Sequence, residues 1–166
     1  MSAYPIQSLA NVDEYAVKTA FVYNFTKFVE WPSSQGRDES VFRVCVVGEQ
    51  DILQRLGQLN DKVSRGRHII VEQKVPYDTF DNCHIVYLAS QPTSQVTELL
   101  ARLANSPILT IGEYKGFASS HGIIEFHVDY ENRVRLKINA ERGRKNHLKL
   151  SAQLLEVAML VMGNKV

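Results

Sequence analysis

The sequence predicts an α/β fold with three layers, in which helices cover both faces of a mainly parallel sheet. Short apolar runs such as FRVCVVG (42–48) and CHIVYLA (83–89) are typical of strands that are buried on both faces. Helical segments separate these runs, and an alternation of strand and helix indicates parallel strands. Towards the C-terminus, GIIEFHVDY and NRVRLKINA alternate around a polar turn, which predicts an antiparallel hairpin at the sheet edge.

The first element is a helix predicted over residues 13–30. Val17, Phe21, Phe25 and Phe28 recur at spacings that place them on one helical face. We expect this face to pack on the core.

Two further aromatic residues of this region, Tyr23 and Trp31, lie off that stripe. Each combines a large apolar area with one polar atom, a combination that protein interfaces favour. We therefore expect Tyr23 and Trp31 to contact a second copy of the chain or another partner.

The next segments follow the order of a Rossmann-like parallel sheet. The predicted strands are residues 42–48, 67–75, 83–89 and 107–113, and the predicted helices are residues 51–60 and 93–104. The expected strand order is 2-1-3-4, so the first and third strands are neighbours.

The segment GEYKGFASSHG (112–122) connects the parallel part to the hairpin. Its glycines and serines predict a flexible surface loop, and loops of this size are often functional. It is either a connector or a lid over a ligand at the carboxyl ends of the strands.

The predicted hairpin turns at Glu131 and carries its charges on one face. The opposed pairs are Glu125 with Lys137, His127 with Arg135, and Asp129 with Arg133. The alternate residues, 124, 126 and 128 with 134, 136 and 138, are expected to face the core. Two interpretations stay open: a solvated face of matched charges, or a polar docking face or anion site formed by Glu125, His127, Arg133, Arg135 and Lys137.

The segment LKLSAQLLEVAMLVM predicts a C-terminal helix that Ser151 caps. The helix is apolar nearly all round, so we expect it to be buried or to pack on another chain.

Composition and motifs argue against several functions. The 166 residues predict one domain, 1–166, and a formal net charge of +1 gives no indication of nucleic-acid binding. VVGEQD has one glycine and two acidic residues, whereas a dinucleotide-binding turn needs several glycines. The sequence lacks a GxSxG motif, and its five histidines lack metal-binding spacing. We expect no catalytic residues, no metal and no cofactor.

The two cysteines, Cys45 and Cys83, fall on strands that the expected order makes neighbours. Adjacent strands lie about 4.8 Å apart, which is within reach of a disulfide. Two buried thiols that act as small apolar residues fit the same pattern, so both interpretations stay open.

The chain resembles the YfiR-like family of bacterial periplasmic proteins over most of its length. The matching stretches, in order, are YAVKTAFVYNFTKFVEWP, FRVCVVG, CHIVYLA, LTIGEYKGFASSHGIIEF, and RVRLKIN followed by LKLSAQLLEVA. Cys45 and Cys83 occupy the positions of a family cysteine pair, so the resemblance implies a disulfide between them. The family's further cysteines near the hairpin have no counterpart here, which puts any role of a second bridge in doubt.

The resemblance implies a non-enzymatic periplasmic protein that binds the periplasmic sensor part of an inner-membrane diguanylate cyclase. Binding would repress the cyclase and lower cyclic-di-GMP signalling and biofilm formation. It also implies a homodimer and sequestration by an outer-membrane lipoprotein. Related domains fused to sensor kinases imply the alternative, a small-molecule-binding sensory domain that acts on a sensor kinase or another membrane partner.

The implied location is the periplasm. The first fourteen residues, MSAYPIQSLANVDE, lack the basic start and apolar stretch of a signal peptide. We therefore expect the sequence to be the mature portion with an added Met.

Overall fold

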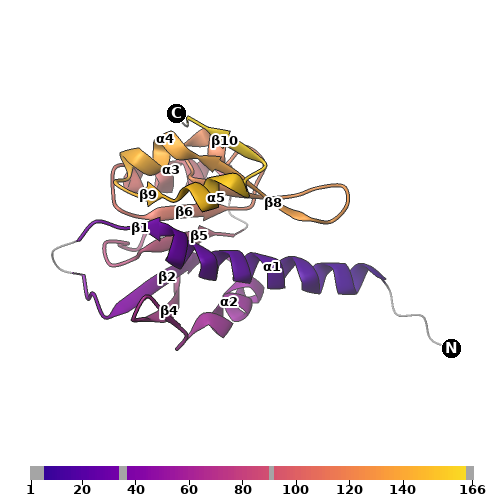
Figure 1. The fold of residues 1–166 in the computed structure, drawn as a ribbon, viewed down its shortest axis with the longest axis horizontal. Coiled ribbons are helices and arrows are strands. Elements are labelled where there is room, and N and C mark those ends of the chain that lie inside the picture. The colour runs from indigo at the N-terminus through magenta and orange to yellow at the C-terminus, as the bar shows by residue number, and fades with distance from the viewer. Residues whose placement is uncertain (1–5, 34–36, 90–91, 164–166) are drawn as a thin grey trace.

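The computed structural model describes residues 6–33, 37–89 and 92–163. Its main feature is an eight-stranded sheet in the order β10-β8-β7-β6-β5-β2-β4-β3 (Figure 1). The strands are β2 (Val41–Val47), β3 (Val63–Ser64), β4 (Arg67–Lys74), β5 (Ile85–Leu88), β6 (Leu109–Gly112), β7 (Ile124–Val128), β8 (Val134–Asn139) and β10 (Leu160–Met162). β4, β2, β5 and β6 are parallel neighbours, which confirms the predicted mainly parallel sheet and its 2-1-3-4 order.

Helices cover both faces of this sheet, as the three-layer prediction requires. α1 (Ile6–Phe28) and α2 (Gln50–Leu56, followed by the 3-10 turn η1, Gly57–Leu59) pack on the face that buries Val44 and Val46. α3 (Thr93–Leu103) packs on the opposite face, against Cys45 and Val47. Alternate residues of β2 thus enter two separate cores, which explains why its residues 44–47, all of them buried, are all apolar.

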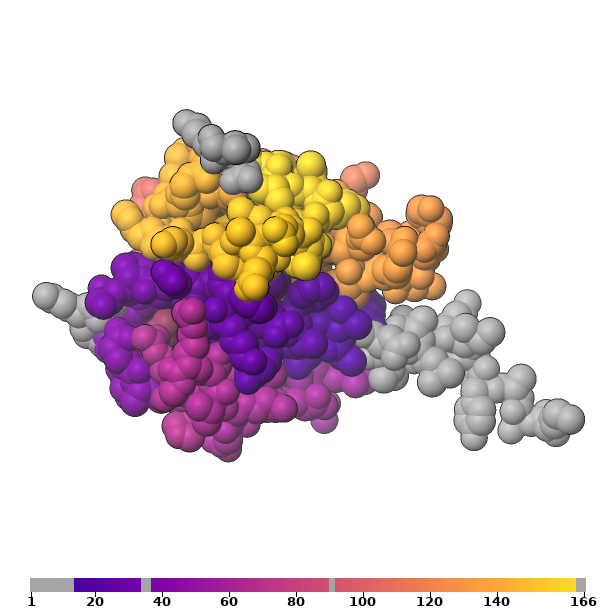
Figure 2. All heavy atoms as spheres, viewed as in Figure 1, coloured from indigo at the N-terminus to yellow at the C-terminus, as the bar shows by residue number. Residues whose placement is uncertain are grey.

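α1 lies between the C-terminal elements and the segments around α2 and β4 (Figure 2). The rings of Phe21 and Phe25 lie 6.0 and 6.1 Å from Phe126 of β7, so the predicted aromatic stripe does pack on the core. The prediction is wrong for Val17, which is 40% exposed. The buried face is rotated by one residue and contains Lys18 in place of Val17.

α1 ends at Phe28, two residues before the predicted end of the helix at residue 30. Val29–Glu30 form β1, which pairs antiparallel with β9 (Lys149–Leu150) in a separate two-stranded sheet. This pairing joins the end of the first helix to the last part of the chain.

The hairpin has the predicted register, with Glu125 opposite Lys137 and His127 opposite Arg135. It does not form the edge of the sheet, because β10 pairs parallel with β8 on the outside. Its end extends beyond the body of the molecule (Figure 1). Val128 is therefore 36% exposed and does not face the core as expected.

The predicted long C-terminal helix is wrong. Ser151 does cap a helix, accepting a hydrogen bond from the Leu154 amide at 3.1 Å, but α5 covers only Ala152–Glu156. The chain then returns to the sheet, where the Met159 amide donates to the Leu136 carbonyl at 2.7 Å and β10 begins. An apolar run that pairs with β8 supplies hydrogen-bond partners to the backbone groups at the free edge of that strand. The run is therefore more stable there as a strand than as an isolated helix.

A short helix before this region was not anticipated. α4 (Ala140–Lys145) begins where β8 ends, and Asn139 caps it by accepting a hydrogen bond from the Arg142 amide at 3.0 Å.

The segment 112–122 is anchored, contrary to the prediction of a flexible surface loop. Phe117 is fully buried and the 3-10 turn η2 (Ala118–Ser120) follows it. The Phe117 ring lies against Gly112 and Gly122, where an added Cβ would meet ring atoms at 2.4 and 2.2 Å. Both glycines are needed because only a residue without a Cβ leaves room for this ring.

Candidate functional site: a polar cleft at the carboxyl ends of the strands

Lys18 is a charged residue on the buried face of α1. Its side chain is 5% exposed, and its ammonium group donates to Glu14 Oε1 at 2.8 Å and to Glu113 Oε1 at 3.0 Å. The ring centres of Tyr15 and Phe126 lie 5.4 and 6.0 Å from the same nitrogen. Burial by itself lowers the pKa of Lys18, but Glu113 and Glu14 outweigh it and raise the pKa above 10.5. Lys18 is thus a fixed positive charge inside the fold.

Glu113 follows β6 directly and connects α1 to the sheet. The oxygen that accepts from Lys18 also accepts a hydrogen bond from the hydroxyl of Tyr87. Tyr87 is fully buried in β5, and burial followed by the charge of Glu113 raises its pKa well above 10.0. The network therefore lies at the carboxyl ends of two parallel strands, where α/β sheets commonly bind ligands.

A further carboxylate, Glu125 of β7, is buried, whereas Glu113 is partly exposed. Glu125 is 1% exposed, and its Oε1 accepts a hydrogen bond from the Ala118 amide at 3.1 Å. Its Oε2 lies 3.7 Å from Lys137 Nζ and has no hydrogen-bond partner in the described part of the chain. The hydroxyl of Tyr114 is also buried without a partner there, and burial followed by the charge of Glu125 raises the pKa of Tyr114.

A cleft of about 350 Å³ lies between α1, the segment after β6, and β7; we call it the β6–β7 cleft. Its lining residues are Glu14, Tyr15, Lys18, Glu113, Lys115, Glu125, Phe126, His127 and Val128. The cleft exists because pairing of β6 with β7 stops at Gly112 and Glu125, while β7 continues to Val128. Charged groups of both signs and two aromatic rings therefore converge on one recess.

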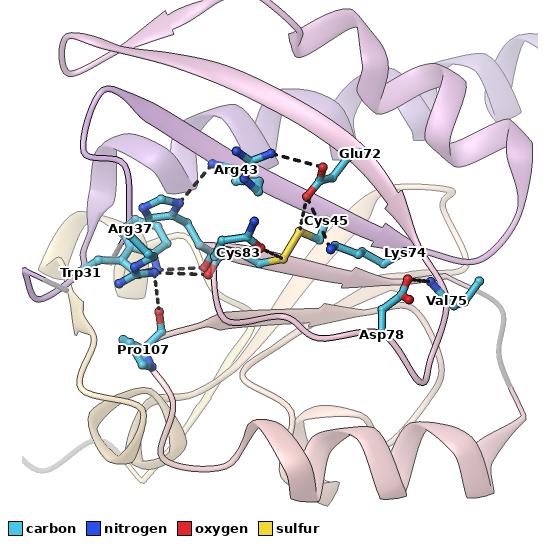
Figure 3. The surroundings of a disulfide bond; sticks show 12 residues. Trp31, Arg37, Arg43, Cys45, Glu72, Lys74, Val75, Asp78, Cys83 and Pro107 are labelled. Atoms are coloured by element: carbon cyan, nitrogen blue, oxygen red, sulfur yellow. Dashed lines mark hydrogen bonds and ion pairs between the residues drawn. A yellow bond between two sulfur atoms is a disulfide. The ribbon is translucent and has the colours of Figure 1, made fainter. Parts of the chain in front are cut away.

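A disulfide joins Cys45 of β2 to Cys83, which precedes β5 (Figure 3). The sulfur atoms are 2.01 Å apart and the Cα atoms 6.0 Å apart, and both residues are fully buried. Of the two interpretations of the sequence, the structure thus has the disulfide. Donor atoms of Cys45, Glu72 and Cys83 lie within 4.8 Å of one another, but bonded sulfurs supply no thiolate to a metal.

The two residues expected at an interface use their polar atoms within the chain. Trp31 donates its indole hydrogen to the His84 carbonyl at 2.9 Å and lies edge-on to Phe42 at 4.8 Å. The hydroxyl of Tyr23 donates to the Val63 carbonyl at 3.1 Å. Both side chains remain partly exposed, so their contact with a partner stays a prediction.

The residues of the predicted polar face of the hairpin lie in different surroundings in the structure. Glu125 and Lys137 form an ion pair of which Glu125 is buried, so a fully solvated face is wrong at this position. His127 lines the β6–β7 cleft, with Arg135 opposite it on β8. Arg133 forms ion pairs of 3.2 and 2.8 Å with two carboxylates of the turn. The anion-site interpretation stays a prediction.

Four residues of the site were not predicted from the sequence: Glu14, Lys18, Tyr87 and Glu113. Two features of the sequence could have indicated Lys18 and Glu113. Lys18 is a lysine within the apolar face of the first helix, and Glu113 is a glutamate directly after a buried strand. Neither feature shows by itself that helix and strand bring the two charges together.

The sequence model of the YfiR/HmsC-like family matches residues 15–159, which is most of the chain. A search of curated proteins found no match. Among the described residues, no helix has both the length and the apolar composition needed to cross a membrane.

Proposed function

The chain belongs to the YfiR/HmsC-like family, and from this we propose that it is a non-enzymatic periplasmic repressor of an inner-membrane diguanylate cyclase. It binds the periplasmic sensor part of the cyclase and thereby lowers cyclic-di-GMP and biofilm formation. A homodimer and an outer-membrane lipoprotein that sequesters it belong to the same proposal.

The family match is the observation that carries this proposal, because the family is regulatory and generally periplasmic. The disulfide between Cys45 and Cys83 supports it, since structural disulfides persist in oxidising compartments such as the periplasm.

Repression by binding requires unequal affinity for the two states of the cyclase. A protein that bound the active and inactive states equally would shift nothing, however tightly it bound. A shift from 99% active to 99% inactive requires about 10⁴-fold preference for the inactive state. The contact must therefore include a surface that moves when the cyclase switches.

The end of the β7–β8 hairpin is the part of the fold best suited to that contact. Tyr130 is 93% exposed at its turn, and Arg133 is held there by ion pairs with Asp129 and Glu131. Tyrosine and arginine are enriched among the residues that dominate interface energies. We include Tyr130 and Arg133 in the proposed docking surface.

The experiment compares cyclic-di-GMP in the native host with and without the exported protein. We expect deletion to raise cyclic-di-GMP and cross-linking to recover a membrane protein with a cyclase domain. Tyr130→Asp should relieve repression, whereas Tyr77→Asp, a matched control at a site that is 82% exposed, should not. Unchanged cyclic-di-GMP on deletion would contradict the proposal.

A second candidate function is favoured by the β6–β7 cleft. A recess of about 350 Å³ with converging polar groups is typical of a small-ligand site, which fits a sensory domain acting on a sensor kinase or another membrane partner.

A further inference from the structure

We propose that the β6–β7 cleft binds a small organic molecule through a primary ammonium group, held by Glu14 and Glu113. This assignment rests on the sensory candidate function and adds the chemical class of the ligand and the residues that select it.

The cleft already holds an ammonium group of its own chain. Lys18 Nζ lies between Glu14 Oε1 and Glu113 Oε1, at 2.8 and 3.0 Å, and near the ring of Tyr15. Two carboxylates and an aromatic ring are the groups that favour a desolvated ammonium ion.

Lys18 uses only one oxygen of each carboxylate. Within the described part of the chain, hydrogen bonds reach Oε1 of Glu14 and Oε1 of Glu113, and none reaches Oε2 of either residue. Their side chains are 23% and 22% exposed, and both residues line the cleft. Since an ionised carboxylate accepts about four hydrogen bonds, both have unused capacity.

Glu125 gives an independent indication of a ligand. It lines the same cleft and is 1% exposed, yet within the described residues its Oε2 has only the Lys137 ammonium at 3.7 Å, which is beyond hydrogen-bond distance. The ion pair with Lys137 offsets part of the charge of this oxygen but leaves it without a hydrogen bond, so a donor from outside the chain would be stabilised there.

The remaining lining residues determine the chemistry and size of the rest of the ligand. Tyr15, which is partly exposed, supplies aromatic surface for an apolar body, whereas Phe126 is 2% exposed and belongs to the core. A volume of about 350 Å³ limits that body to a small molecule. Lys115 and His127 also line the cleft. Lys115 is exposed, so solvent and salt largely screen its charge.

The test uses the intact protein and three probes of similar shape: benzylamine, benzyl alcohol and benzoate. At pH 7 and low salt, titration followed by amide NMR should show saturable benzylamine binding at residues around Glu14 and Glu113. Benzyl alcohol and benzoate should bind at least about tenfold more weakly, because a charge-assisted hydrogen bond contributes roughly 1.5–3 kcal/mol.

Variants then locate the site. Glu113→Gln and Glu14→Gln should each weaken benzylamine binding about tenfold or more, while Glu156→Gln, an exposed control on α5, should leave it unchanged. If Glu113→Gln does not fold, Glu14→Gln decides, since Glu14 lies on the helix surface.

Equal binding of the amine and the alcohol, or equal binding by Glu14→Gln and wild type, overturns the assignment. Absence of saturable amine binding also overturns it. Binding of benzoate or benzyl alcohol in the cleft instead would reject the ammonium class while the sensory function stands.

Discussion

Tyr87 and Glu113 are joined by a hydrogen bond between the ends of two neighbouring strands. The phenol, fully buried in β5, donates to the carboxylate that follows β6. Lys18 donates to the same oxygen, so one carboxylate fixes α1 against the sheet. A buried network of this kind is sensitive to any change in the charge of its members.

The stability of the fold should fall at alkaline pH because of Tyr87 and Lys18. The pKa of Tyr87 is raised by burial and then by Glu113, and the pKa of Lys18 is also raised. The unfolded chain therefore releases these protons near pH 10 while the folded chain keeps them. The stability that they contribute is complete below about pH 10 and is lost as the pH rises further.

Urea unfolding between pH 8 and 11 checks this prediction. Tyr87→Phe should make the decline shallower by up to about 1.4 kcal/mol per pH unit. Identical slopes for Tyr87→Phe and wild type would show that Tyr87 titrates normally in the folded protein.

Replacement of the buried lysine should be strongly destabilising. Lys18→Met leaves Glu14 and Glu113 without their cation, and we expect a loss of about 3–5 kcal/mol in the free energy of unfolding. Lys145→Met is the control, because Lys145 forms an exposed pair with Glu141, and its replacement should cost less than about 0.5 kcal/mol. Equal effects of the two variants would mean that the Lys18 network is not structural.

The lowered pKa of His84 predicts that the folded protein loses stability at acid pH. Burial, and then the charges of Arg37, Arg67 and Arg43, lower this pKa to about 3. The folded pKa lies below the unfolded one, so the contribution is complete above about pH 6.5 and is lost as the pH falls towards 3. NMR titration should show His84 neutral at pH 5; a midpoint near 6.5 would contradict this.

Reduction of the disulfide should also destabilise the fold. The cysteines are 38 positions apart, and chain entropy gives a stabilisation of about 4 kcal/mol for a loop of this length. The oxidised chain should weigh two hydrogen masses less than the reduced one and unfold at a higher urea concentration. Equal masses of an oxidised and a reduced preparation would disprove the bond.

The packing of Phe117 predicts which glycines are irreplaceable. Gly122→Ala would place a Cβ 2.2 Å from the Phe117 ring, and overpacking of this kind costs about 1–3 kcal/mol. Combination with Phe117→Ala should remove most of that extra cost, because the two changes share one contact. Gly57→Ala is the control: the nearest atom is 3.9 Å away, and the residue has helical angles.

The sequence was informative where one periodicity dominated. β2 and β5 follow from apolar runs, and the hairpin register follows from matched charges around its turn. The prediction from the sequence was wrong where the composition of a segment is compatible with both a helix and a strand. The run after Glu156 has the composition of a buried helix, yet the free edge of β8 makes it a strand.

The candidate site was not predictable, because it depends on long-range contacts. Lys18 and Glu113 are 95 positions apart, and only the packing of α1 across β5 and β6 brings them together. The cysteine pair could be placed on adjacent strands beforehand because strand order was enough to decide their proximity.

The pairing of β1 with β9 has a consequence for the order in which the chain can fold. β4, β2 and β5 lie close together in the sequence, so they can assemble early with little loop to close. The aromatic face of α1 is different: its partner Phe126, like the strand at Leu150 that pairs with β1, is made much later than the helix. Until they arrive, the first helix exposes its phenylalanines, and it is the segment that a chaperone would have to shield.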